Sequence, residues 1–140
     1  MPIEGNTIQN PDLVHAMDLF LVNKSELNGK RMSKELNRAT FLVPISLPED
    51  IPADHLEENL KNVEIRYLML DQKSTGQSFL MAFTDREEMK KWNEEEVPAI
   101  FCPFSSLQEI VLKYADQCGG MVINPFHHSI VITAQNIKLP

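Results

Sequence analysis

The sequence has few of the residues on which several protein classes depend. Only two cysteines, Cys102 and Cys118, occur among its 140 residues, and they lack the paired short spacings of a zinc site. Its five glycines form no phosphate-binding loop, because Gly119-Gly120 fits neither the Walker nor the dinucleotide-binding spacing. No apolar run approaches the ~18 residues that a membrane-spanning helix needs. We therefore expect no disulfide scaffold, no nucleotide loop and no membrane partner.

Basic side chains are also in short supply. The chain has 13 lysines and arginines against 20 acidic residues, so its net charge is −7 at neutral pH. A chain of this charge repels phosphate, and we expect no nucleic-acid partner. Hydrophobic residues make up 43% and charged residues 24%, which is typical of a globular protein. Because residues 1–5 lack the features of a signal peptide, we expect a cytoplasmic location and one domain over residues 1–140, with a core over about 10–133.

The first 40 residues predict a helical hairpin. Asn10 is a preferred N-cap residue, and Pro11 suits the first position of a helix, where no amide donor is needed. Apolar residues then recur with helical spacing over residues 11–22. A second helix is predicted over residues 25–38, which form the most basic stretch of the chain. The two segments are close enough in sequence to pack as an antiparallel pair.

Two further helices are predicted from capping boxes. Thr84 begins one box and a helix over residues 85–95, and Ser105 begins another and a helix over residues 105–118, which Gly119 would end in a left-handed conformation. Three acidic residues fall in the first turn of the earlier helix, where their charge complements the helix dipole: Asp85, Glu87 and Glu88. Capping thus explains these acids without an acid–base role.

Short apolar or alternating segments predict the strands. The segment that ends at Pro44 and residues 79–83 are apolar, and residues 63–70 alternate. We expect 63–70 and 79–83 to form an antiparallel hairpin, and two strand–helix–strand units to add parallel neighbours. The fold class is then α+β, a mixed sheet of about five or six strands flanked by helices, with an N-terminal helical hairpin. The expected strands are residues 40–44, 63–70, 79–83, 99–102, 121–123 and 129–133.

Several motifs, taken in order, resemble the N-terminal domain of the SseB-like family. The two best matches are the strand-to-helix segment Phe83–Glu88 and the segment Gly120–Pro125, which reads G-x-V-I-N-P. Asn10–Leu13, Phe41–Pro44 and Trp92 fit the same order, so the resemblance covers roughly residues 10–133. It implies a mixed α/β module without an established catalytic residue or cofactor.

The segment around Asn124-Pro125 is a candidate binding loop. Proline favours an extended conformation for Asn124, whose amide can bond nearby backbone. His127 and His128 follow, and together with Cys118, Cys102 or Asp116 they could suggest a metal site. Adjacent side chains point opposite ways in an extended segment, however, so we expect no metal ion and no cofactor.

Cys102 has two open interpretations. It lies in an apolar segment, where a buried thiol is inert, but it also precedes a predicted helix whose dipole would activate it. In the second case, a pocket near Cys102, Asn124 and His127 would bind a small molecule or act as a hydrolase.

No complete catalytic constellation is present in the sequence, so we expect a non-enzymatic module that binds a protein partner. Its expected surfaces are the acidic segment 44–62, the basic segment 24–38 with Lys30, Arg31 and Lys34, and the turn 124–129. The alternatives are the small-molecule protein just described and an immunity-type acidic inhibitor, which would mask a basic partner by charge complementarity. The sequence leaves the oligomeric state open.

Overall fold

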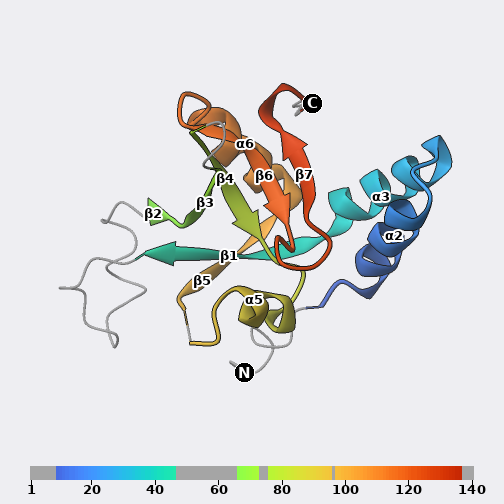
Figure 1. Ribbon diagram of the computed structural model, residues 1–140, viewed down its shortest axis with the longest axis horizontal. Coiled ribbons are helices and arrows are strands. Elements are labelled where there is room, and N and C mark those ends of the chain that lie inside the picture. Colours follow the sequence, from blue (N-terminus) through green and yellow to red (C-terminus); the bar gives the residue numbers. More distant parts are fainter. Residues whose placement is uncertain (1–8, 47–65, 73–75, 96, 137–140) are drawn as a thin grey trace.

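The computed structural model describes residues 9–46, 66–72, 76–95 and 97–136, which form an α+β fold (Figure 1). Two helices at the N-terminus make a hairpin that projects from the β-sheet body, and two shorter helices pack on that body. The helices are α2 (Pro11–Val22), α3 (Glu26–Arg38), α5 (Arg86–Trp92) and α6 (Phe104–Lys113), followed near the C-terminus by the 3₁₀ turn η2 (Ala134–Asn136). The expected class and the expected helical hairpin are confirmed.

The strands divide between two sheets. One sheet has the order β2-β1-β5, and it contains β2 (Arg66–Tyr67), β1 (Thr40–Ser46) and β5 (Ala99–Pro103). The other has the order β3-β4-β6-β7, and it contains β3 (Met69–Gln72), β4 (Gln77–Ala82), β6 (Cys118–Ile123) and β7 (Ile130–Thr133). The sheets meet where Leu42 and Phe83 exchange two backbone hydrogen bonds of 2.9 Å each.

The pairing of strands differs in part from the expectation. The antiparallel hairpin of β3 and β4 is confirmed. The two successive parallel crossovers are not, because β5 pairs antiparallel with β1 in the other sheet and β4 pairs parallel with β6. Apolar patterning marks a segment as a strand, but it carries no information about which edge the strand will join.

Two strand boundaries also differ. Pro44 lies inside β1, where its carbonyl accepts a hydrogen bond from the amide of Leu68. The alternating segment expected over 63–70 is divided at Leu68 into β2 and β3, so that one run of chain serves both sheets. Residues 63–65, and the acidic segment apart from its first three residues, lie outside the described residues.

The capping residues at the N-termini of α2 and α5 are not those expected. The side chain of Asn10 makes no cap; its Nδ2 donates instead to the carbonyls of Thr40 and Thr84, at 2.9 and 2.8 Å. Asp85 rather than Thr84 caps α5, accepting from the amide of Glu88 at 3.0 Å. Thr84 instead bonds the side chain of Asn124.

Helix α6 is shorter than its apolar pattern suggests. It begins at Phe104 without a side-chain cap and ends at Lys113, so the second capping box is wrong. Cys118 and Gly119 belong to β6, and of the adjacent pair Gly119-Gly120 it is Gly120 that has a positive φ, at +152°. The apolar spacing extends to Cys118, past the end of the helix at Lys113, because Cys118 belongs to the buried strand that follows the helix.

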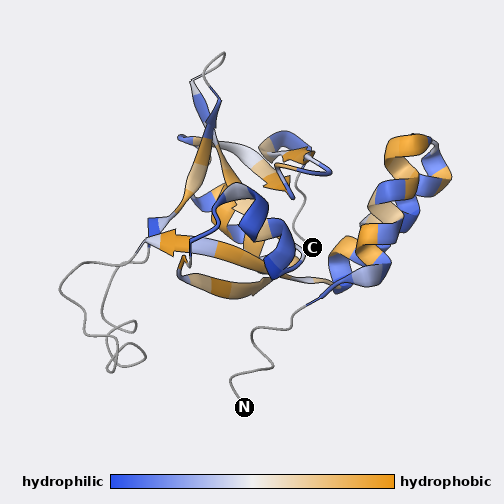
Figure 2. Ribbon diagram, turned by 60° about the horizontal axis from the view of Figure 1, so that its bottom comes forward, coloured by the Kyte–Doolittle hydropathy of each residue, from blue (hydrophilic) through white to orange (hydrophobic). Residues whose placement is uncertain are grey.

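The main core lies between the sheets and the helices. The hairpin contributes its apolar face to that core, and the strands contribute their inward residues, which form the orange bands in Figure 2. Its largest fully buried members include Leu13, Met17, Phe41, Leu80, Leu107, Met121 and Ile123. No helix in the described part of the chain combines the length and the apolarity needed to cross a membrane.

Substituting two glycines with alanine should have opposite effects. A Cβ at Gly120 would overlap the carbonyl oxygen of Ile132 on β7, so Gly120→Ala should lower the free energy of unfolding by about 3 kcal/mol. A Cβ at Gly29, inside α3, would lie 3.6 Å from Cε1 of Phe20, so Gly29→Ala should raise it by about 1 kcal/mol. Urea unfolding measures both, and equal stability of the two variants would contradict the prediction.

Candidate functional site

The loop 124–129 joins β6 to β7 at the carboxyl end of the parallel pair β4–β6. Its first amide, on Asn124, donates to the carbonyl of Ala82 at 2.9 Å. The carbonyl of Asn124 then accepts from the amides of His127 and Ser129, at 3.0 and 2.8 Å, which closes the loop into a tight turn. Carboxyl ends of parallel strands are where ligand sites often form in α/β proteins.

Asn124 is the anchor of this loop. Its side chain is fully buried: Oδ1 accepts from the amide of Thr84 at 3.0 Å, and Nδ2 donates to Thr84 Oγ1 at 3.0 Å and to His128 Nδ1 at 3.1 Å. The extended conformation expected from Pro125 is wrong, because Asn124 has a φ of +50°. Asparagine tolerates this left-handed region better than most residues, and the three hydrogen bonds offset its cost.

These contacts determine the tautomer of His128. The backbone amide of Thr84 can only donate, so it faces Oδ1 of Asn124 and the NH₂ group faces His128. Nδ1 of His128 must then accept, and the ring proton lies on Nε2. Nε2 is 2.8 Å from Asp18 Oδ1 on α2, to which it donates, and the His128 side chain is fully buried.

His127 has the opposite tautomer. Its Nδ1 is 2.8 Å from Oε2 of Glu88 on α5, and a carboxylate can only accept. Nδ1 therefore carries the proton, and Nε2 keeps a bare lone pair on a side chain that is 45% exposed. Lys91 donates to the same Oε2 at 2.9 Å, and its Nζ is also 3.2 Å from Nδ1 of His127.

The Glu88 carboxylate is buried and charged. Burial by itself would raise the pKa of Glu88, but the hydrogen bonds from Lys91 and His127 and the positive charge of Lys91 outweigh it, so this pKa lies below its ordinary value. Its second oxygen, Oε1, is buried without a hydrogen-bond partner among the described residues.

The two histidine rings therefore lie together instead of pointing apart. Their centroids are 3.9 Å from each other, because residues 124–128 form a turn and not the extended segment that we expected. One ligand-type atom from each of Asp18, His127 and His128 lies within 4.8 Å of the other two. The thiols and Asp116 considered as partners from the sequence are not in this group.

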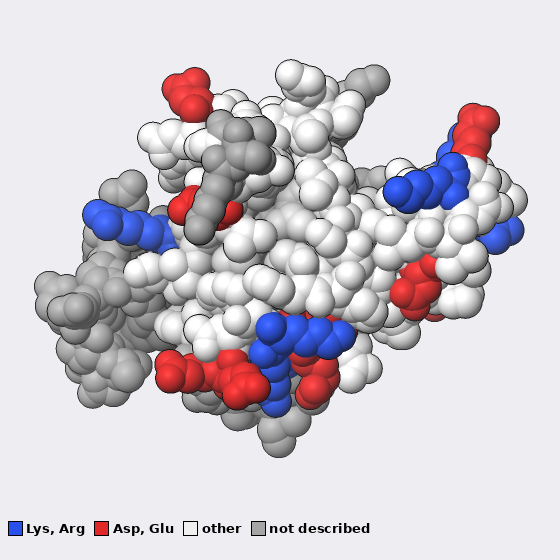
Figure 3. Space-filling view, in the orientation of Figure 1, with Lys and Arg blue, Asp and Glu red and all other residues white. Residues whose placement is uncertain are grey.

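The other residues singled out in the sequence lie elsewhere, apart from the half-buried Pro125 in the same loop. Lys30, Arg31 and Lys34 are exposed on α3, and Nζ of Lys30 lies 3.4 Å from the Glu26 carboxylate. Figure 3 shows both positive and negative side chains on the projecting hairpin.

Cys102 is buried in β5, where burial raises the pKa of its thiol and favours the inert interpretation. It lines a cavity of about 340 Å³, but neither Asn124 nor His127 lines that cavity. The lining residues are Tyr67, Cys102, Ser106, Glu109, Ile110, Lys113 and Tyr114.

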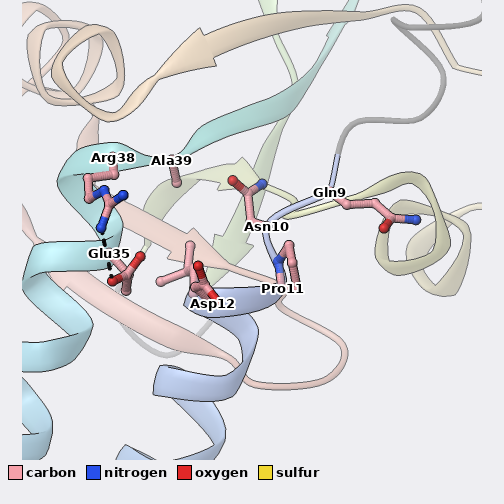
Figure 4. Close-up of a pocket in the computed structure, with 8 residues that line it drawn as sticks. Gln9, Asn10, Pro11, Asp12, Glu35, Arg38 and Ala39 are labelled. Atoms are coloured by element: carbon pink, nitrogen blue, oxygen red, sulfur yellow. Dashed lines mark ion pairs between the residues drawn. The ribbon is translucent and has the colours of Figure 1, made fainter.

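A smaller cavity of about 170 Å³ lies at the base of the hairpin (Figure 4). Arg38 and Glu35 form an ion pair of 3.7 Å on its wall, and the amide of Asn10 is engaged by two backbone carbonyls. The charged and amide groups that line this cavity are thus largely used within the fold.

The family model of the SseB protein N-terminal domain matches residues 13–138. The chain belongs to this family. Neither the comparison with curated proteins nor the comparison with solved structures gives a match. In this SseB-family chain, the two segments that carried the resemblance meet in space: Thr84 of the first bonds Asn124 of the second, and Glu88 bonds His127 just beyond it.

Three residues of this site were missed at the level of sequence. Asp18 is 110 residues from His128, and Glu88 is 39 residues from His127, so no local spacing connects them. Glu88 was interpreted only as an acid in the first turn of a helix, and Lys91 follows it by one helical turn. Two adjacent histidines after a buried strand were the available signal.

Removing the Asn124 amide should destabilise the fold strongly. Asn124→Ala leaves Thr84 without its buried partner and keeps an unfavourable φ, so we expect a loss of about 3 kcal/mol. Asn124→Gly should cost about 1 kcal/mol less, because glycine accepts positive φ. Urea unfolding measures both. Asn37→Ala, on the exposed side of α3, is the control, and a similar loss there would contradict this account.

The Glu88 contacts should make stability depend on pH. A lowered folded pKa means that the charged carboxylate stabilises the fold fully above its ordinary value of 4.5, and that the contribution disappears as the pH falls through the lower folded value. Wild type should therefore exceed Glu88→Gln in stability most at neutral pH, and the difference should shrink in acid. Thermal unfolding between pH 7 and 3 tests this. Glu87→Gln, a highly exposed neighbour, should show little difference at any pH.

Proposed function

We propose that this chain is a non-enzymatic protein-binding module that contacts its partner through the tip of the α2–α3 hairpin. The observation that carries the proposal is the exposure of large apolar side chains where the two helices join. Val22 is 87% exposed, Leu27 58% and Leu21 41%. The hairpin projects from the body (Figure 1), and its outer end carries apolar segments beside hydrophilic ones (Figure 2). Apolar side chains clustered on a projecting element are typical of an interaction site.

The charge around the tip points to the kind of partner. Helix α3 and the connection before it carry more basic than acidic side chains, whereas the chain as a whole has a net charge of −7. The basic residues are Lys24, Lys30, Arg31, Lys34 and Arg38, and the acidic ones are Glu26 and Glu35, which pair with Lys30 and Arg38. A positive element on a negative protein is suited to an acidic surface. The partner should therefore offer an apolar depression with an acidic rim.

The alternatives have less support. The 340 Å³ cavity that Cys102 lines includes no residue of the loop 124–129, and the thiol is buried with a raised pKa, so a hydrolase that combines them is not favoured. An acidic inhibitor would use the segment 44–62, most of which is outside the described residues.

Photo-crosslinking from the tip tests the proposal. A photoreactive amino acid at Val22 should cross-link a defined acidic protein in the cells that make this chain, and cross-linking should weaken with added salt. Leu27→Asp should reduce the yield at least tenfold, because a few apolar anchors dominate such contacts. Charge reversal at Lys30, Arg31 and Lys34 should also reduce it, because it places like charges opposite each other.

Val131 is the matched control position, because it is 52% exposed and lies on the edge strand β7. Equal cross-linking from Val22 and Val131, or a yield indifferent to the charge reversal, would contradict the proposal.

A further inference from the structure

We propose that Asp18 and His127 form a binding site for a divalent cation of the Zn²⁺ type, with Glu88 and His128 holding the two ligands in place. This inference is independent of the proposed function, because none of the four residues belongs to the hairpin tip.

His127 has the arrangement of a metal ligand. Its Nδ1–H is engaged by the Glu88 carboxylate at 2.8 Å, which leaves the lone pair on Nε2, and the side chain is 45% exposed. Metal-binding histidines nearly always donate their second ring N–H to a carboxylate or carbonyl, which fixes the tautomer and makes the free nitrogen more basic. The sequence separation of 39 residues shows that this pairing is a product of the fold and not of a local turn.

Asp18 supplies the second ligand from α2. Its side chain is about half exposed, and Oδ1 accepts from Nε2–H of His128, which leaves Oδ2 for a cation. Hydrogen bonding of this kind also orients ligating carboxylates in metal sites. Zn–N and Zn–O bonds of about 2.1 Å need ligand atoms within about 4.2 Å of each other. Asp18, His127 and His128 each have one ligand-type atom within 4.8 Å of the other two, so a rotation of the exposed Asp18 and His127 side chains would bring Oδ2 and Nε2 to one cation.

His128 supports this site and does not ligate the cation. Ligation through Nε2 would require the ring proton to move to Nδ1, where it would face the NH₂ group of Asn124. Turning the Asn124 amide over would in turn leave the buried amide of Thr84 opposite another donor. The backbone N–H of Thr84 therefore fixes the orientation of the Asn124 amide, and this amide keeps the ring proton of His128 on Nε2, where it is donated to Asp18.

The donor set determines the class of cation. One imidazole nitrogen and one carboxylate oxygen suit Zn²⁺ and its neighbours, whereas Mg²⁺ and Ca²⁺ prefer oxygen ligands throughout. Lys91 opposes any cation here, because its Nζ lies 3.2 Å from Nδ1 of His127. A bound ion would connect α2 of the hairpin to the loop that follows β6.

Calorimetric titration of the full chain with zinc chloride tests the site. Wild type should bind one equivalent. Asp18→Asn and His127→Ala should abolish binding, and His128→Ala should weaken it about 10–100-fold. Lys91→Met should tighten binding, because it removes the opposing charge. His15→Ala and Asp116→Asn, both exposed and outside the cluster, are the matched controls and should bind as wild type does.

NMR of the imidazole nitrogens tests the site in the wild-type protein, so the result does not depend on whether a variant folds. In wild type, His127 should show the Nδ1–H form and His128 the Nε2–H form, and zinc should shift Nε2 of His127 while His128 keeps its tautomer. The proposal is overturned if there is no saturable binding, if binding is unchanged in His127→Ala, or if His128 changes to the Nδ1–H form on addition of zinc.

Discussion

The buried amide of Asn124 is the contact on which the rest of the structure depends. It connects the carboxyl ends of the parallel strands β4 and β6 by taking the backbone amide and the hydroxyl of Thr84. The carbonyl of Thr84 is held from the other side by Asn10, at the start of the helical hairpin. The backbone amide of Thr84 is thus bonded by the last loop and its carbonyl by the residue before the first helix, and its hydroxyl bonds both Asn124 and Asp85. Because buried polar groups are costly when unpaired, these two asparagines leave little freedom in how the hairpin, α5 and the loop are joined.

Local chemistry was sufficient to predict much of the fold. The bounds of α2 follow from Asn10-Pro11 and from the apolar spacing, and the hairpin of β3 and β4 follows from its alternation and turn. The errors arose where two elements compete for the same residues. Thr84 could cap a helix or bond Asn124, and the choice depends on a residue 40 positions away. The division of the strands between two sheets was likewise beyond prediction, since no pattern states which edge β5 will join.

The candidate site was half predictable. Asn124, His127 and His128 are visible as polar residues after an apolar strand, but their carboxylate partners are not. In the sequence, Asp18 looks like a solvated residue on an amphipathic helix. An acidic residue at position 88 is already explained by its place in the first turn of a helix. The adjacent histidines were interpreted as divergent because the positive φ of Asn124 depends on contacts that form only in the folded protein. Long-range hydrogen bonds, not local propensity, define this site.

The span of 110 residues between Asp18 and His128 has a consequence for how the chain is made. The ribosome releases α2, with its apolar residues Leu13 and Met17, long before β6, β7 and the loop between them exist. Part of the core that surrounds the nascent hairpin, including Met121, Ile123 and Ile130, is therefore missing until the last quarter of the polypeptide emerges. A chain that stops short of that loop would lack the imidazole that bonds Asp18, and its first helix would have no polar contact to the last part of the fold.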